Sequence, residues 1–317
     1  MRAPEFWARD DWRARLLAPL GLLYGASVEW KRRDARPYRA GAAVICVGNL
    51  TVGGTGKTPV AIAIARTLKE RGRRPVFLSR GYGGRLGGPI EVHAGNSAAD
   101  VGDEPLLLAQ TAPVVVARDR AQGARLAEQL GDTIVMDDGH QNFALQKNLS
   151  LIVVDAETGF GNGRVVPAGP LREPVAQGLA RADAVILTGD GTVALDGFAK
   201  PVLRTHLVQH GVAVAGKQVV AFAGIGRPDK FFHALESQGA HLAATKSYAD
   251  HHAYTQAELA RLKAKARAHR ALLVTTEKDF VRLTPSQRDG ITPLPVHAVF
   301  DGAEALARLL DSLPPTR

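Results

Sequence analysis

The chain has 317 residues, of which 45% are hydrophobic and 22% are charged. This is the composition of a globular protein long enough for two domains, and it excludes a largely disordered chain. Lysine and arginine number 40 against 31 aspartates and glutamates, which gives a formal net charge of +9. Such a charge favours an anionic partner such as a nucleotide, a nucleic acid or an acidic lipid surface. The single cysteine, Cys46, excludes an internal disulfide and a cysteine-based zinc site.

The N-terminal segment combines all three tryptophans with an apolar stretch and a basic end. Trp7 and Trp12 precede the apolar stretch 16–24, and Trp30 is followed by the basic run 31–33. The stretch is too short to span a bilayer, which needs about 20 apolar residues, and the acidic residues before it are atypical of a signal peptide. Two interpretations stay open, and both can be partly true: a helix at a membrane surface and a helix packed on the protein's own core.

A glycine-rich loop follows the first buried strand, expected at 42–47. Residues 48–59 read Gly-Asn-Leu-Thr-Val-Gly-Gly-Thr-Gly-Lys-Thr-Pro, and helical spacing follows them. This context predicts a phosphate-binding loop, in which backbone N–H groups and a helix N-terminus hold phosphate oxygens. The strict pattern has glycine at position 51, where this chain has threonine. We expect Lys57 on the β- and γ-phosphates and Thr58 on Mg²⁺. The complete set of expected nucleotide-binding residues is Gly53, Gly54, Thr55, Gly56, Lys57 and Thr58.

Charged residues follow the next strand-like run, at 75–78. Arg80 and Arg85 lie in a glycine-rich loop at the end of that strand, where they could hold a substrate phosphate or simply be solvated. Asp103 and Glu104 stand before a helical run, in a position where acidic residues also complement a helix N-terminus without any further function.

Two further groups have the chemistry of a phosphoryl-transfer site. The strand expected at 133–136 ends at Asp137 and Asp138, and two adjacent carboxylates are costly unless a cation is present. A phosphate-binding loop makes that cation plausible. Asp250 precedes His251 in a loop, and an aspartate can hold a histidine in one tautomer, although a histidine in a loop is more often structural.

Strand-like runs alternate with helical ones and predict a doubly wound, mostly parallel sheet of the α/β class. A run at 202–208 alternates apolar and polar residues and could pair with 295–300 as a two-stranded linker to a second, smaller α/β domain. The expected organisation is an N-terminal membrane-associated segment, a core domain, a smaller domain with its linker, and a C-terminal helix that returns to the core. Their ranges are 1–35, 36–200, 201–300 and 301–317. The expected core strands are 42–47, 75–78, 113–117, 133–136, 151–154 and 184–187.

The motifs together are more specific than a generic phosphate-binding loop. In chain order they are the loop 48–59, Ser-Arg-Gly-Tyr-Gly-Gly at 79–84, Val-Gly-Asp-Glu-Pro at 101–105, Asp-Asp-Gly at 137–139, Gly-Asn-Gly-Arg at 161–164, Pro-Ala-Gly-Pro-Leu-Arg-Glu-Pro at 167–174, Asp-His-His at 250–252 and Thr-Thr-Glu-Lys-Asp at 275–279. This set resembles the tetraacyldisaccharide 4′-kinase family of lipid A biosynthesis, from the N-terminal segment to near residue 300. One departure is His140, because the family segment usually reads Asp-Asp-Gly-Phe-Gln-His.

The resemblance implies an ATP- and Mg²⁺-dependent kinase that phosphorylates the 4′-hydroxyl of a tetraacylated glucosamine disaccharide 1-phosphate to form lipid IVA. The family acts at the cytoplasmic face of the inner membrane of Gram-negative bacteria, so the expected partners are this lipid and the cytoplasmic leaflet, with no nucleic acid and no obligate protein partner.

The resemblance also implies roles for single residues. Asp103 would be the base near the acceptor hydroxyl, with His251 as its partner, and domain closure would bring the two together. Glu104 and Asp137 would belong to the metal shell. Asp138 would lie beside them, and on chemistry alone it could equally be the base. Glu173 matches a further acidic position of the family, near the substrate.

Two alternatives of other classes remain. A GTPase switch or metallochaperone would need a guanine-reading Asn/Thr-Lys-x-Asp, and the nearest match, at 277–279, lacks that spacing. A basic nucleic-acid-binding ATPase would need a recognition module, and the sequence contains none that we can identify.

Overall fold

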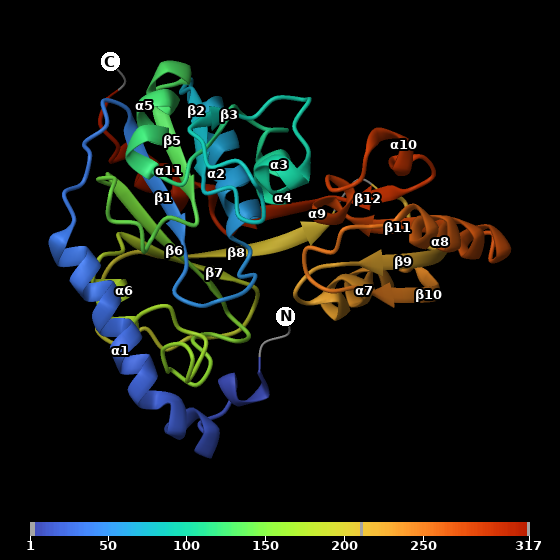
Figure 1. Cartoon of the computed structure of the whole chain (residues 1–317), viewed down its shortest axis with the longest axis horizontal. Coiled ribbons are helices and arrows are strands. Elements are labelled where there is room, and N and C mark those ends of the chain that lie inside the picture. The colour runs from blue at the N-terminus through green and yellow to red at the C-terminus, as the bar shows by residue number, and fades with distance from the viewer. Residues whose placement is uncertain (1–3, 210–211, 316–317) are drawn as a thin grey trace.

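A nine-stranded sheet forms the larger part of the protein, with the strand order β13-β8-β7-β6-β1-β5-β2-β4-β3 (Figure 1). The computed structural model describes residues 4–209 and 212–315. Residues 1–3, 210–211 and 316–317 belong to ranges expected for the N-terminal segment, the small domain with its linker and the C-terminal helix, and they lie outside the described residues.

Six of the inner strands run parallel to one another and are buried along their whole length, because helices cover both faces of the sheet. They are β1, β2, β4, β5, β6 and β7. Only the two edge strands, β3 and β13, pair antiparallel with their neighbours. The strands are β1 (Ala43–Gly48), β2 (Pro75–Ser79), β3 (Ile90–Glu91), β4 (Val114–Val116), β5 (Thr133–Asp137), β6 (Leu149–Asp155), β7 (Ala184–Thr188), β8 (Val202–Gln209) and β13 (Val296–Phe300).

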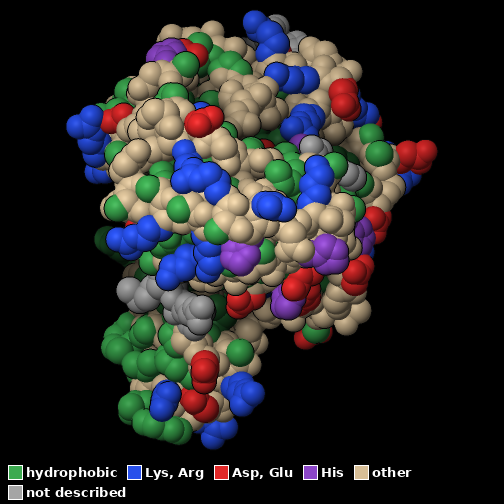
Figure 2. All heavy atoms as spheres, turned by 90° about the vertical axis from the view of Figure 1, so that its right-hand side faces the viewer, with side chains coloured by type: hydrophobic (Ala, Val, Ile, Leu, Met, Phe, Trp, Pro, Cys, Tyr) green, Lys and Arg blue, Asp and Glu red, His purple; other side chains and the backbone are tan. Residues whose placement is uncertain are grey.

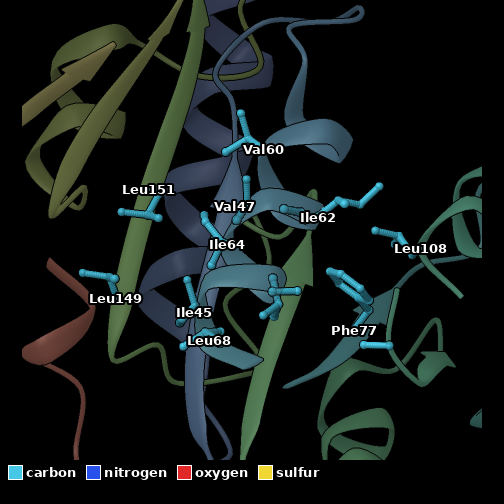
Figure 3. Packing of buried hydrophobic residues seen from close by; sticks show 14 of the residues in the cluster. Ile45, Val47, Val60, Ile62, Ile64, Leu68, Phe77, Leu108, Leu149 and Leu151 are labelled. Carbon is cyan, nitrogen blue, oxygen red and sulfur yellow. The ribbon is translucent and has the colours of Figure 1, made fainter. Parts of the chain in front are cut away.

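Helix α2 packs on one face of this sheet through residues spaced one turn apart. Val60, Ile64 and Leu68 are buried against Ile45 and Val47 of β1 (Figure 3). The last helix, α11, adds Leu306 and Leu310 to the same cluster. The helices of this part are α2 (Lys57–Glu70), α3 (Ala98–Val101), α4 (Asp103–Leu108), α5 (Arg120–Leu130), α6 (Val175–Ala180) and α11 (Ala303–Asp311).

A smaller four-stranded parallel sheet, in the order β10-β9-β11-β12, has its own apolar cluster on each face. Its strands are β9 (Gln218–Ala223), β10 (His241–Ser247), β11 (Leu272–Thr276) and β12 (Thr292–Leu294). Its helices are α7 (Pro228–Ser237), α8 (Gln256–Ala268), α9 (Glu277–Phe280) and α10 (Pro285–Arg288). The antiparallel pair β8–β13 joins the two parts, as Figure 1 shows.

The predicted fold class is therefore confirmed: a mostly parallel sheet covered on both faces and a smaller α/β domain reached through a two-stranded linker. The sequence patterns did not predict β3, β10 or β12. β10 is a half-exposed edge strand, and β12 has three residues with a proline in the middle. Neither carries the apolar run by which a buried strand is recognised.

The N-terminal segment forms a short 3₁₀ helix, η1 (Glu5–Trp7), and the long helix α1 (Trp12–Asp34). Asp11 caps α1 by accepting hydrogen bonds from the N–H groups of Arg13 and Ala14. The helix packs on the protein through Ala14, Gly21, Gly25 and Val28. A Cβ at Gly21 would lie 2.7 Å from the carbonyl oxygen of Val165, so this approach requires glycine.

The opposite side of α1 is apolar and exposed. Trp12, Leu16, Leu23 and Trp30 are each about 70% exposed, and Leu20 is 52% exposed. Spacings of three, four and seven residues place these side chains in one stripe, the apolar stripe, away from the packed face. One face of α1 therefore packs on the protein, as one of the two interpretations predicted. The other interpretation, a helix at a membrane surface, concerns the opposite, exposed face. None of the described helices is long and apolar enough to cross a membrane.

Candidate active site

The glycine-rich loop joins β1 to the N-terminus of α2, at the centre of the sheet. Gly56 caps α2 and Lys57 is its first residue. Nothing lies within 4 Å of where a Cβ at Gly53 or Gly54 would be, so the crest of the loop is open. Thr188, at the end of β7, donates a hydrogen bond to the carbonyl of Thr55 at 3.2 Å. The neighbours of β1, namely β5 and β6, lie on its two sides, and ligands of doubly wound sheets bind at such a switch point.

Asp137 ends β5 beside this loop. The Thr58 hydroxyl donates to its Oδ2 at 3.2 Å, while its buried Oδ1 has no hydrogen-bond partner. Burial and the nearby charge of Glu104 raise the pKa of Asp137 to about 7. An orphaned carboxylate oxygen beside a hydroxyl and a second carboxylate is the hard-oxygen environment that suits Mg²⁺. In the described part of the chain no three acidic, histidine or cysteine side chains could hold a metal ion by themselves.

Asp138 has cationic neighbours instead. Arg172 donates to its Oδ1 at 2.7 Å, and the Lys57 ammonium lies 3.8 Å from the same oxygen. Burial opposes ionisation of this carboxyl, but Lys57 and Arg172 outweigh it and lower the pKa of Asp138. Asp138 is one of three non-glycine residues with positive φ in the described chain, at 55°. This left-handed turn directs consecutive carboxylates to different partners.

Asp103 and His251 meet across the two domains. His251 Nδ1 lies 2.9 Å from Asp103 Oδ2, and Nε and Nη2 of Arg282 donate to the same oxygen at 2.8 and 2.5 Å. Burial disfavours the charge on Asp103, but the His251 hydrogen bond and the cations Lys278 and Arg282 prevail and lower the pKa of that carboxyl. An ionised carboxylate only accepts hydrogen bonds, so Nδ1 of His251 carries the hydrogen, and in a neutral ring the lone pair lies on Nε2.

Two glycine-rich motifs hold this pair in place. A Cβ at Gly102, where φ is 89°, would lie 2.5 Å from the carbonyl oxygen of Tyr82, so α4 can begin against the 79–84 loop only with glycine there. The ring of Tyr82 lies 5.5 Å from that of His251, centroid to centroid. His251 itself has a φ of 59°, a conformation that clusters at functional sites.

Glu104 faces a lysine of the small domain: Lys278 Nζ lies 3.1 Å from Glu104 Oε1. Lys278 and its neighbour Asp279 belong to the segment that came nearest to a guanine-reading motif. Asp279 is fully buried and accepts hydrogen bonds from the backbone of Gly224 and the hydroxyl of Tyr254. It is therefore engaged inside the small domain, which argues against a GTPase switch.

The structure does not bring every expected residue to the phosphate-binding loop. Arg80 is exposed at the end of β2, and Arg85 is paired with Asp100 at 2.6 Å. Glu173 is 1% exposed, and its two carboxylate oxygens accept from Gln141 at 2.9 Å and Arg181 at 2.5 Å. This differs from the expected substrate contact, because both oxygens are already satisfied within the protein.

Four charged residues near this site were not singled out from the sequence: Arg172, Lys278, Arg282 and Arg120. Arg120 is 3% exposed at the start of α5, its Nε has no partner, and burial together with Arg80 lowers its pKa to about 10. Arg172, Lys278 and Arg282 lie in or next to motifs named above. Those motifs therefore indicated the region of the site but not which acidic residue each cation would contact.

A phosphate-binding loop at the switch point of a parallel sheet, with an acidic pair beside it and an aspartate–histidine contact at the start of the neighbouring helix α4, defines a P-loop phosphotransferase. The family described as tetraacyldisaccharide-1-P 4′-kinase matches residues 13–314, and the chain belongs to that family of kinases.

Individual relatives agree with this assignment. The chain is 50% identical to the tetraacyldisaccharide 4′-kinase of Rhodospirillum rubrum, over 99% of this chain and 98% of the relative. It is 52% identical to that of Dinoroseobacter shibae, with the same coverage. Among solved structures it resembles LpxK from Aquifex aeolicus, crystallised in complex with ATP. The TM-score is 0.79 at 26% identity, over 94% of this chain and 98% of that one.

Proposed function

We propose that this protein transfers the γ-phosphoryl group of ATP to the 4′-hydroxyl of a tetraacyldisaccharide 1-phosphate, giving lipid IVA. The observation that carries the proposal is the contact of Asp103 with His251 at the start of α4, the helix that lies against α2 and its phosphate-binding loop. The relatives of about 50% identity bear the name of this kinase over their full length, and the Aquifex aeolicus relative was crystallised with ATP.

For the nucleotide, we propose that the loop from Gly53 to Thr58 cradles the phosphates and that Lys57 reaches the β- and γ-phosphates. Thr58, Asp137 and Glu104 would hold Mg²⁺, with phosphate oxygens and water completing its shell. When bound, this ion would neutralise charge on the transferring group. The orphaned Oδ1 of Asp137 supports this assignment, because it is the one buried carboxylate oxygen of the described residues that lacks a partner.

The proton of the acceptor hydroxyl needs a base, and the geometry favours His251 over Asp103. Oδ2 of Asp103 already accepts from His251 and twice from Arg282, and its pKa is lowered. A carboxylate in that state is a weak base. In a neutral ring, Nε2 of His251 would offer its lone pair to the acceptor hydroxyl while Asp103 orients the ring, which are the roles of the two residues in a catalytic aspartate–histidine pair. We therefore propose His251 as proton acceptor and Asp103 as its orienting partner.

Other residues receive supporting roles in this proposal. Arg80 and Arg85 would approach a substrate phosphate, Arg85 by exchanging its partner Asp100. Asp138, held by Lys57 and Arg172, would keep these cations near the phosphates. We also propose that the four expected ranges act as anchor, kinase core, small domain and returning helix, since β8 and β13 are the link between the two sheets.

The acceptor has four acyl chains, so the kinase must work at a membrane. We propose that the apolar stripe of α1 docks on the cytoplasmic leaflet of the inner membrane, with the basic run 31–33 near anionic headgroups. The stripe is exposed while the opposite face is packed. In Figure 2, hydrophobic side chains gather at the lower end of the molecule, where Figure 1 has the beginning of α1.

The catalytic proposal is tested by transfer of labelled γ-phosphate to detergent-dispersed tetraacyldisaccharide 1-phosphate. We expect product with the wild type and a loss of about 10²-fold or more in kcat for His251→Ala and for Asp103→Ala. GTP in place of ATP should support less transfer. If the wild type yields no lipid product while it binds ATP, the acceptor assignment is wrong, and if both variants keep full activity the assigned roles are wrong.

The membrane proposal is tested by sedimentation with vesicles that contain anionic phospholipid. The double variant Leu16→Glu, Leu23→Glu should lose most of its vesicle binding because it charges the apolar stripe. A matched control, Ala257→Glu with Ala260→Glu, adds the same charge to an exposed face of α8 and should bind as the wild type does. Equal binding by the wild type and both variants would contradict the proposal.

A further inference from the structure

Arg282 follows α9 in the small domain, yet its guanidinium reaches the core domain. Nε and Nη2 donate to Asp103 Oδ2 at 2.8 and 2.5 Å. Nη1 donates to the carbonyl of Gly224 and to Asp279 Oδ1, both at 2.8 Å. The side chains of Arg282 and Asp103 are 6% and 3% exposed, so this contact between domains is shielded from water.

The same atoms also hold His251. Its backbone N–H donates to the carbonyl of Gly224 at 3.2 Å, and its Nδ1 meets Asp103 Oδ2 at 2.9 Å. Arg282, Asp103, His251 and Gly224 therefore form a closed ring of hydrogen bonds across the domain interface. In such a ring, no member can move without breaking a bond to one of the others.

The ring rests on a rigid base. Asp279 is fully buried and, besides Arg282, accepts from the N–H of Gly224 at 3.0 Å, the hydroxyl of Tyr254 at 2.7 Å and the hydroxyl of Thr276 at 2.6 Å. The planar fork of Arg282 is thus fixed from the side of the small domain before it meets Asp103. A lysine could supply the charge but not this set of directed donors.

We propose that Arg282 is a positioning residue for phosphoryl transfer: it docks the small domain on Asp103 and so holds His251 where the acceptor hydroxyl is presented. This inference rests on the proposed function. It differs from a purely structural ion pair in one respect. A structural pair changes how much protein is folded, whereas a positioning residue changes the turnover of protein that is folded, because displacement of a catalytic group by about 1 Å can reduce the rate about 10²-fold.

The test compares Arg282→Lys and Arg282→Ala with the wild type by steady-state transfer kinetics. We expect kcat to fall about 10-fold in the lysine variant and about 10²-fold or more in the alanine variant, with the KM for ATP within about threefold, because the nucleotide loop lies in the other domain. Low millimolar guanidinium should restore part of the kcat of Arg282→Ala, and sodium chloride of equal ionic strength should not.

The control is Arg288→Ala. Arg288 belongs to the same segment, but its side chain donates to the carbonyls of Phe280 and Val281 and stacks on the ring of Phe280, all within the small domain. Its removal should leave kcat within about twofold, as for a peripheral interaction. Wild-type kcat in folded Arg282→Ala, or a loss of kcat that only matches the loss of folded protein, would overturn the inference.

A second measurement is independent of catalysis. Hydrogen exchange of the His251 amide, which donates to Gly224, should be faster in both Arg282 variants than in the wild type and Arg288→Ala. Unchanged exchange would overturn the docking role. If the wild type transfers no phosphate but the variants show this exchange pattern, the proposed function is wrong and Arg282 is still the docking residue. Failure of the proposed function can therefore be distinguished from failure of the docking role.

Discussion

Asp137 is buried at the end of β5 with one oxygen that has no partner, and its pKa is raised to about 7 by burial and by Glu104. A carboxyl group whose folded pKa is raised stabilises the fold fully below its unfolded pKa, near 4, and this contribution is lost as the pH rises through 7. At higher pH the free protein therefore carries an uncompensated charge at the position where we propose Mg²⁺.

We predict that Asp137→Asn has opposite effects on stability and activity. Asparagine keeps the shape and removes the buried charge, so without Mg²⁺ and nucleotide at pH 8 the variant should be more stable by about 1 kcal/mol or more. It should lose about 10²-fold or more in kcat, because an amide oxygen is a weaker ligand for the ion. Urea unfolding and transfer assays measure the two effects.

The reference variant is Asp132→Asn, because Asp132 stands just before β5, its carboxylate accepts from the N–H of Arg74, and it lies outside the proposed site. It should lower stability slightly and leave kcat unchanged. The prediction for Asp137→Asn is wrong if that variant is less stable than the wild type at pH 8.

His140 is the departure from the family pattern, and it is buried between two partners. Its Nδ1 lies 3.2 Å from the Ser150 hydroxyl and its Nε2 lies 3.1 Å from the carbonyl of Gly178. Burial, with the charges of Lys147 and Arg181, lowers the pKa of His140 to about 3. The sequence alone did not show how this position packs. In the structure, a neutral imidazole ring occupies it, between Ser150 and Gly178.

We predict that His140→Phe changes the pH dependence of stability. Between pH 6.5 and 3 the unfolded chain takes up a proton that native His140 does not, so wild-type stability falls with decreasing pH by up to about 1.4 kcal/mol per unit. Phenylalanine removes this contribution but leaves the Ser150 hydroxyl without its partner, while the carbonyl of Gly178 keeps its bond from the N–H of Arg181, at a cost of about 1 kcal/mol at pH 8. The urea midpoint of the variant should therefore lie below that of the wild type at pH 8, and at pH 5 this difference should shrink or change sign. The same difference between the two proteins at both pH values would contradict the prediction.

At the scale of elements, the N-terminal segment is attached through η1 to the loop that enters the candidate site. Asn162 donates from its backbone to the carbonyl of Trp7 at 2.8 Å, and from its side chain to the carbonyls of Phe6 and Ala168 at 3.0 Å. Its loop continues to Arg172, which contacts Asp138. The Gly-Asn-Gly-Arg motif thus joins the anchor segment to the kinase core.

We predict that Gly21→Val loosens α1 from this loop. The added atoms would overlap the carbonyl of Val165, so the helix must shift, at a cost of about 1–3 kcal/mol. Trypsin should then cleave within α1 faster, since the helix carries several arginines, while ATP binding by the core persists. The control Ala26→Val adds bulk on an exposed side of the same helix. Equal cleavage rates in the two variants would contradict the prediction.

At the scale of the whole molecule, charged groups among the described residues join the small domain to the core at two places besides the linker. One is the pairing of Asp103 and Glu104 with Arg282 and Lys278. The other is Asp155 at the end of β6, whose Oδ2 accepts from Arg227 at 2.8 Å and Lys230 at 3.3 Å. Burial opposes the charge on Asp155, but these two cations outweigh it and lower its pKa.

We predict that Asp155→Asn frees one side of the small domain. Asparagine retains an acceptor for the nearby backbone but loses the charge that holds Arg227 and Lys230, at a cost of about 1–3 kcal/mol. Hydrogen exchange in α7 should become faster. Glu157→Gln is the matched control, because Glu157 pairs with Lys230 at an exposed position, and such pairs contribute about 0–1 kcal/mol. Identical exchange in the two variants would contradict the prediction.

Local patterns in the sequence predicted the fold class and the place of the phosphate-binding loop. Apolar runs identified β1, β2, β4, β5, β6 and β7, because a strand buried on both faces must be apolar along its whole length. The phosphate-binding loop was recognisable because strand, loop and helix are contiguous, and its function depends on backbone groups that need glycine. Asp137 followed from its place at the end of a strand.

Only the tertiary structure decided which charges meet. Arg282 is 179 positions from Asp103, and Lys278 is 174 positions from Glu104. Nothing in the spacing of these residues encodes their contact, since it depends on how two separately folded sheets dock. The same holds for Glu173, which the sequence offered as a substrate contact and the fold buries between Gln141 and Arg181. A motif whose interacting groups are adjacent in the chain can be recognised from the sequence, whereas an ion pair between domains forms only once both domains have folded.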